Sequence, residues 1–260
     1  MVKRPFSFSY LAVMFVFLYA PIAVLIVFSF NATRSTSSWG GFSLEWYKAL
    51  FEDRQIMKAL YYTLLVASLS ALISAIAGTA AAVGIHRMKP RIRRVFLTLN
   101  NVPVLNPDIV TGVSLMVLFT ALNLTLGFSS LLLAHITFNI PYVVLCILPK
   151  LRQLPAEVTE AAMDLGATPF YAFRKVVIPE IAPGIFTGIL IAFTLSIDDF
   201  VISFFTTGNG VNNLSIVVYS MARRGINPKI NAVSTILFAA VFILLLIINK
   251  RDAAAKKLEV

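Results

Sequence analysis

The residues best suited to chemistry in this 260-residue chain are acidic groups inside apolar stretches. Asp108, Asp198 and Asp199 lie in long runs that are otherwise uncharged, and Ser196 adds a hydroxyl close by. A carboxylate at the centre of a bilayer costs about 3 kcal/mol on insertion scales, so such residues usually face a bundle interior or a wet cavity. We therefore predict that these four residues line a path for a cation. Residues 198 and 199 point about 100° apart on a helix, so at most one of them faces the path squarely.

An aromatic face can complement such carboxylates, because its π-electrons attract a cation. Trp46, in the polar stretch that follows the first apolar run, is our candidate for this role near the outer end of the path. The alternative interpretation is a residue of the aromatic belt at the membrane interface, and it fits Trp46 at least as well.

A second acidic group lies in the polar stretch 151–180. Glu157, Glu160 and Asp164 recur at spacings of three and four residues, which places three carboxylates on one helical face. Ala161 and Ala162 lie beside them, and their small side chains would let another protein approach the helix closely. A solvated acidic face on an interfacial helix is the alternative.

Helix signals divide this stretch. Pro155 fits a first turn, and Gly166 fits the left-handed position that ends a helix. Thr168 and Pro169 fit the N-cap and first residue of a second short helix, which we expect to reach about Val177. The stretch is therefore predicted to form two short helices joined at Gly166.

Other kinds of site find no support in the sequence. No phosphate-binding G-x-x-x-x-G-K-[ST] motif is present, so any nucleotide chemistry must come from another chain. His86 and His135 have no cysteine or carboxylate at metal-ligand spacing. We predict no catalytic residue, no metal site and no cofactor in this chain.

The elements that position these residues are apolar helices. The chain is 58% hydrophobic and only 13% charged, which indicates lipid as its solvent. A spanning helix needs about 20 apolar residues. Gly184 and Gly188 form a G-x-x-x-G motif, and small residues gather at 75–84; both are typical of helix packing. The charge-free gaps predict an all-α membrane protein with six spans, at about 9–30, 58–85, 96–122, 127–149, 182–207 and 230–249.

Basic residues predict the orientation of these spans. Six spans leave both termini on one side, and that side holds 15 of the 22 lysines and arginines, so both termini are expected in the cytoplasm. The formal charge of +10 is largely this topology signal, which argues against nucleic-acid binding. Seven basic residues depart from the bias and fall in the first and last outside loops: Arg34, Lys48, Arg54, Lys58, Arg223, Arg224 and Lys229.

The stretch 151–180 carries a specific word order. Glu160-Ala161-Ala162, then Gly166, Val176, Ile178 and Pro179, resembles the EAA loop of ABC importer permeases at every spacing. Val176 and Ile178 depart from the family's isoleucine and leucine but remain aliphatic. In that family this loop is the coupling helix, which docks into a groove of the ATPase subunit. The resemblance therefore implies an ATPase-coupling role for Glu157, Glu160, Ala161, Ala162, Asp164, Gly166 and Pro179.

The resemblance extends over the whole chain. The segments 19–22, 44–47, 103–108 and 195–200 are similar to those of spermidine/putrescine permeases. This implies one type I permease domain over 1–260, with its core at about 56–250, in a bacterial inner membrane. It also implies a heterodimer with a homologous sister permease, two ATPase subunits that bind ATP and Mg, and a periplasmic polyamine-binding protein. The chain itself would be a transport subunit and no enzyme.

Other functions stay open at this point. An ABC permease could carry a metal, thiamine or another organic cation. An ion-coupled secondary transporter could use the aspartates as ion sites, but it leaves the EAA-like loop unexplained. The aspartates could also pair with arginines or backbone groups of the sister subunit and so hold the two halves together.

Overall fold

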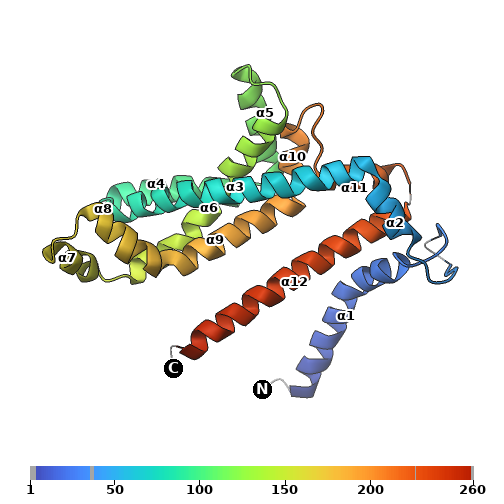
Figure 1. The fold of residues 1–260 in the computed structure, drawn as a ribbon, viewed down its shortest axis with the longest axis horizontal. Coiled ribbons are helices and arrows are strands. Elements are labelled where there is room, and N and C mark those ends of the chain that lie inside the picture. Colours follow the sequence, from blue (N-terminus) through green and yellow to red (C-terminus); the bar gives the residue numbers. More distant parts are fainter. Residues whose placement is uncertain (1–3, 36–37, 226, 259–260) are drawn as a thin grey trace. The chain divides into compact units, whose positions relative to one another are not determined.

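The computed structural model describes residues 4–35, 38–225 and 227–258, and most of that length is helical (Figure 1). Within these ranges the chain forms no strand, only an isolated bridge between Asn31 and Phe42. The helices are α1 Arg4–Phe28, α2 Glu45–Glu52, α3 Arg54–Arg87, α4 Pro90–Leu105, α5 Asp108–Ala121, α6 Phe128–Gln153, α7 Ala156–Asp164, α8 Pro169–Ala172, the π-helical turn η1 Phe173–Val177, α9 Ile178–Asp198, α10 Val201–Thr206, α11 Leu214–Arg223 and α12 Pro228–Leu258.

These helices form two compact units. Unit 1 comprises Met1–Met57 and Val217–Val260, and unit 2 comprises Lys58–Ile216. A single domain over 1–260 remains a prediction.

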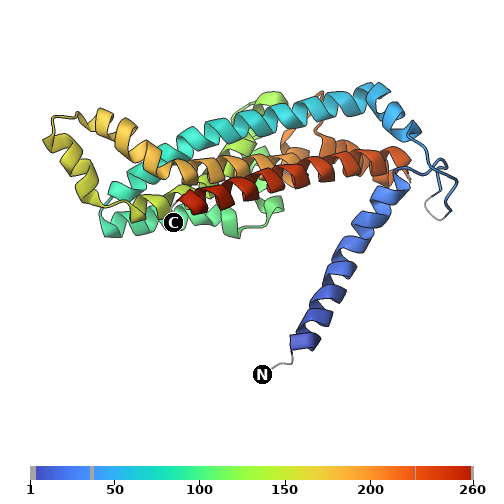
Figure 2. The same ribbon diagram turned by 60° about the horizontal axis from the view of Figure 1, so that its bottom comes forward.

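The core of unit 2 is formed by α3, α6 and α9, which run side by side in both views (Figures 1 and 2). Gly184 and Gly188 bring α9 against α6: a Cβ added to Gly184 would lie 2.9 Å from the carbonyl oxygen of Cys146, and one added to Gly188 would lie 3.3 Å from Val143. The predicted packing role of the G-x-x-x-G motif is therefore confirmed. Fully buried aliphatic side chains fill the space between the three helices: Val143, Val144, Ile147 and Ile181.

Glycine also brings α3 close to α6. A Cβ added to Gly78 would lie 2.6 Å from Cγ1 of Val143, and Ala75 and Ala82 are buried on the same helix. The predicted packing surface at 75–84 is thus correct for these residues. Gly84 differs, because an added Cβ there meets no atom within 4 Å.

Two predicted spans are interrupted. The span expected at 96–122 is not one straight helix, because α4 and α5 meet at 105° across Asn106 and Pro107. Proline lacks a backbone donor, so the predicted kink before Asp108 is confirmed. The span expected at 182–207 is also corrected: α9 ends at Asp198 and α10 begins at Val201.

The candidate membrane spans can be counted over the residues that the structure describes. Four helices are long and apolar enough to cross a bilayer, namely Ser9–Phe28, Arg54–Arg87, Phe128–Gln153 and Pro169–Asp198. The bent pair α4 and α5 would be a fifth. The sixth predicted span, 230–249, lies within α12, and six spans remain a prediction.

In unit 1 the loop after α1 is held by hydrogen bonds to one buried side chain, Asn31. The Asn31 amide donates to the carbonyl oxygens of Ser35 and Ser38 at 2.8 Å, and its Oδ1 accepts from the Gly40 N–H at 2.7 Å. Asn31 is fully buried, so these bonds satisfy a group that would be costly to leave unpaired. The loop after α1 therefore has a fixed shape where it is described.

An ion pair ties the start of α12 to the junction of α2 and α3. Lys229 Nζ donates to Asp53 Oδ2 at 2.9 Å. Burial raises the pKa of Asp53, but the Lys229 hydrogen bond and the backbone N–H groups of Ile56 and Gln55 outweigh it and hold the pKa below its ordinary value. Asp53 therefore stays ionised at neutral pH, and the ion pair persists.

The glycine contact predicts a clear asymmetry between two valine substitutions. Gly184→Val should force α9 away from α6 and destabilise the folded chain by about 1–3 kcal/mol, the usual cost of overpacking. Gly84→Val adds the same side chain where space is open and should change stability little. Thermal unfolding of the two purified variants measures the difference, and equal melting temperatures would contradict the packing role.

Candidate functional site

Asp108 occupies the first turn of α5, directly after the break at Pro107. Its side chain is exposed on the surface of the unit. The partial positive charge of a helix N-terminus stabilises a carboxylate there. The position of Asp108 is thus electrostatically favourable even without a partner.

Asp198 is the last residue of α9 and is also exposed. A helix C-terminus carries partial negative charge, so a carboxylate is disfavoured there. Among the described residues no lysine or arginine forms an ion pair with Asp198. Helix stability therefore does not explain this residue.

The two exposed carboxylates lie near one another. The negative charge of Asp108 acts on Asp198, and it also acts on the phenol of Tyr142 in α6. Tyr142 packs against Phe138, with ring centroids 5.3 Å apart. Both carboxylates stand beside helix breaks: Asp108 follows the break between α4 and α5, and Asp198 precedes the break between α9 and α10.

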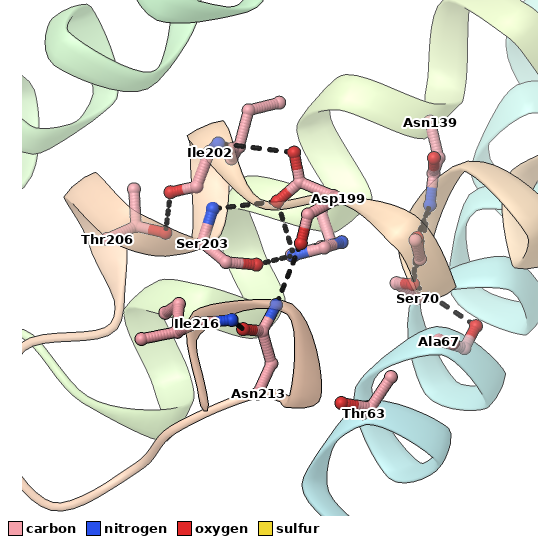
Figure 3. Close-up of polar contacts among 12 residues, drawn as sticks. Thr63, Ala67, Ser70, Asn139, Asp199, Ile202, Ser203, Thr206, Asn213 and Ile216 are labelled. Carbon is pink, nitrogen blue, oxygen red and sulfur yellow. Dashed lines mark hydrogen bonds and ion pairs between the residues drawn. The ribbon is translucent and has the colours of Figure 1, made fainter. Parts of the chain in front are cut away.

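The Asp199 side chain lies against the start of the next helix, α10, beside Ile202 and Ser203 (Figure 3). Its Oδ1 accepts from the Ile202 N–H at 3.2 Å, and its Oδ2 accepts from the Ser203 N–H at 2.7 Å. These are first-turn donors of α10, so the Asp199 carboxylate, one residue before the N-cap Phe200, satisfies two N–H groups that lack partners within the helix. His135 Nε2 lies 3.6 Å from Oδ2, and the Asp199 side chain is only 7% exposed.

Ser196 lies in a buried polar cluster. Its hydroxyl is 3.2 Å from that of Ser70 and accepts from the Asn139 amide at 2.8 Å, which links α9 to α3 and α6. All three side chains are buried. Ser196 is therefore engaged within the helix packing.

Trp46 is likewise engaged inside its own unit. The indole N–H donates to the carbonyl oxygen of Asn31 at 2.7 Å, and the side chain is 8% exposed. These contacts favour a structural role for the ring.

The loop 151–180 forms the turn expected at Gly166. Gly166 has φ +89°, and the Thr168 hydroxyl accepts from the Tyr171 N–H at 3.3 Å as the N-cap of α8. The second predicted helix does not end near Val177, because α8 continues through η1 into α9 as one 30-residue helix to Asp198. The carboxylates of the predicted acidic face are exposed, namely Glu157, Glu160 and Asp164. Of the other motif residues, Ala161, Gly166 and Pro179 are exposed, whereas Ala162, Val176 and Ile178 are half-buried.

Apolar side chains are also exposed around this turn. Leu165 is 90% exposed and Phe170 is 71% exposed. Leu165 is also one of the residues that line a pocket of about 500 Å³: Ala162, Leu165, Gly166, Ala167, Thr168, Tyr171 and Val176. Figures 1 and 2 place α7 beyond the ends of α3 and α6, where another protein can reach it.

Sequence reasoning missed several polar groups of unit 2. His135 and Asn139 lie four residues apart on α6, a spacing that indicates one helical face, and both are buried. His135 Nδ1 and Asn139 Oδ1 have no hydrogen-bond partner in the structure. Tyr142 carries no comparable signal in the sequence. Among the described residues no group of three potential metal ligands comes together.

Comparison with known proteins places this architecture. Residues 74–251 match the family described as "Binding-protein-dependent transport system inner membrane component". The Escherichia coli K12 putrescine transport system permease protein PotI is 40% identical over 92% of this chain and 88% of the relative. The spermidine/putrescine transport system permease protein PotC of the same strain is 38% identical over 91% of this chain and 90% of the relative.

Solved structures share the fold. A chain of a bacterial ABC transporter that imports the acidic polysaccharide alginate aligns with TM-score 0.72 and 15% identity, over 95% of this chain and 96% of that one. A chain of the MetNI methionine ABC transporter aligns with TM-score 0.63 and 19% identity, over 78% and 98%. With helical spans, an EAA-like loop and these relatives, the chain belongs to the family of inner-membrane components of binding-protein-dependent transport systems.

Proposed function

We propose that this chain is the permease subunit of an ATP-driven importer of polyamines such as putrescine and spermidine. It forms half of the translocation path, and a homologous sister permease supplies the other half. The observation that carries the proposal is the pair Asp108 and Asp198: two exposed carboxylates within range of each other, without a cationic partner among the described residues.

The substrate class follows from this pair. A polyamine carries two or more ammonium groups joined by short methylene chains, so it can neutralise two nearby carboxylates at once. Tyr142 provides an aromatic ring within electrostatic range of Asp108, and aromatic faces attract ammonium groups. The names of the relatives, a putrescine and a spermidine/putrescine permease, support the same class.

The loop 151–180 supports a separate motor. Exposed Leu165 and Phe170 and the pocket at Gly166 offer an apolar surface for another protein, whereas the sequence has no phosphate-binding loop. We assign this surface to one of two ATPase subunits, which bind ATP and Mg. Binding energy at the loop would then couple ATP hydrolysis to motion of the helices.

Orientation and partners complete the proposal. The chain lies in the bacterial inner membrane with both termini in the cytoplasm, and a periplasmic polyamine-binding protein delivers the substrate. The distribution of lysine and arginine supports this orientation, since 15 of 22 lie on the side of the termini.

Charge removal at the carboxylate pair tests the substrate path. Asp108→Asn and Asp198→Asn keep the size and hydrogen-bonding capacity of the side chain but remove its charge. Losing about 1.4 kcal/mol of stabilisation raises the transport barrier by that amount and slows uptake roughly tenfold. We expect at least that loss in polyamine uptake per assembled complex, whereas Glu52→Gln on α2 should leave uptake unchanged.

The rival packing role gives a different result. If the aspartates hold the sister subunit, the Asn variants assemble poorly but transport normally once normalised to purified complex. Unchanged normalised uptake in both variants would remove these residues from the path.

Asp199 should behave differently from its neighbour. Asp199→Ala removes the acceptor of two N–H groups at the start of α10, and losing such a cap costs about 1–2 kcal/mol. We expect a lower melting temperature of the purified complex, and a smaller drop for Asp199→Asn, which keeps one acceptor oxygen. Full thermal stability together with lost uptake would instead place Asp199 in the path.

The coupling role is tested at Gly166. Its φ of +89° is closed to proline, so Gly166→Pro must rebuild the turn between α7 and α8. We expect uptake to fall to background and ATPase co-purification to weaken, while the permease pair still assembles. Gly210→Pro strains an open turn of φ +98° in the opposite loop and should spare the ATPase contact. Normal transport by Gly166→Pro would refute the docking role.

A further inference from the structure

Basic residues in the predicted outside loops run against the usual charge bias of membrane proteins. Three of them meet in unit 1: Arg34, Arg224 and Lys229 line one pocket of about 430 Å³, together with Trp46, Met221, Gly225, Asn227 and Pro228. No aspartate or glutamate is among these lining residues. Three of the seven basic residues that depart from the charge bias thus share one pocket, and this clustering calls for its own explanation.

The charges in this pocket do not cancel. Lys229 is paired with Asp53 at 2.9 Å. Arg34 and Arg224 are both exposed, and within the described ranges neither has an acidic partner at ion-pair distance. The pocket therefore keeps a net positive charge and attracts an anion.

The pocket walls are held in place before any ligand arrives. The Trp46 ring is fixed by its hydrogen bond to Asn31, and Asn227 Oδ1 accepts from the Lys229 N–H at 3.0 Å. The ion pair with Asp53 fixes the Lys229 side chain. A preformed site loses less conformational entropy on binding than a set of mobile surface side chains.

The chemistry of the pocket selects the occupant. A polyamine is a cation and is repelled here. Arginine forks bind carboxylates in a bidentate manner. A binding-protein-dependent permease must also meet a soluble protein on the outer side. We propose that this pocket receives an aspartate or glutamate side chain of the extracytoplasmic binding protein, an inference that rests on the proposed function and orientation.

A neighbouring arginine provides the matched control. Arg223 precedes Arg224 in the chain and is equally exposed, but it is absent from the pocket lining and its guanidinium lies 5.9 Å from the centre of the Tyr219 ring. Arg224→Glu and Arg223→Glu therefore change the net charge of this face identically, and only the first changes the pocket.

The experiment uses the assembled transporter in vesicles of zwitterionic lipid, titrated with substrate-loaded binding protein while ATP hydrolysis is followed. For Arg224→Glu we expect the half-saturating concentration of binding protein to rise about tenfold, with the plateau preserved and the salt dependence reduced. For Arg223→Glu the rise should stay below about twofold. If the charge-reversal variant Arg224→Glu does not assemble, the milder variant Arg224→Gln, which only removes the charge, takes its place.

A charge swap completes the test. In this swap, one surface aspartate or glutamate of the binding protein is replaced by lysine. The substituted binding protein should return the half-saturating concentration to its normal value with Arg224→Glu and raise it with the wild-type permease. Equal shifts for the two arginines, or no shift for Arg224→Glu, would overturn the proposal. So would a shift that follows the content of anionic lipid in the vesicles, since it would assign the pocket to a lipid phosphate. If ATP hydrolysis by the wild-type complex responds to a binding protein loaded with another substrate and not to the polyamine-loaded one, the proposed substrate is wrong. The Arg224 and Arg223 variants then test the pocket with that other binding protein.

Discussion

The constraint on which this structure depends is that backbone polar groups in lipid must find partners within the protein. Continuous helices satisfy it, and the chain departs from them inside unit 2 at two breaks, Asn106–Pro107 and Asp199–Phe200. At the second break the Asp199 carboxylate accepts two of the freed N–H groups. The breaks also expose Asp108 and Asp198, because a helix end lets a side chain leave the packed face. The two carboxylates of the candidate site therefore lie at the helix ends that these breaks create.

Much of the fold could be predicted because the signals are local. Charge-free runs locate the helices, Pro107 marks the kink, and Gly166 with Thr168 marks the turn in the loop 151–180. The bend angle and the continuity of α8 through η1 into α9 could not be predicted, because both depend on packing between helices distant in sequence. The end of α9 at Asp198 was missed because apolar residues resume directly after Asp198 and Asp199, and neither proline nor glycine marks the break.

The candidate site shows the same division. Asp198 and Asp199 are adjacent and chemically identical, so the sequence could state only that they point apart. Their roles separate in three dimensions, because Asp199 lies beside His135 and the first turn of α10, whereas Asp198 is exposed. Ser196 was assigned to the path for its hydroxyl, but its partners Ser70 and Asn139 come from helices more than 50 residues away in the chain. Only the tertiary structure could reveal them.

The continuity of the helix from Pro169 to Asp198 gives the proposed coupling a physical form. Its N-terminus follows the turn at Gly166, and its C-terminus carries one carboxylate of the pair. At 1.5 Å per residue its 30 residues span about 45 Å, the thickness of a whole bilayer with its headgroups. Gly184 and Gly188 pack this helix closely against α6, so in the proposed coupling a force applied at the loop would reach Asp198 without an intermediate domain. The π-helical turn Phe173–Val177 interrupts the regular hydrogen bonding near the loop end, where a helix that transmits motion can yield.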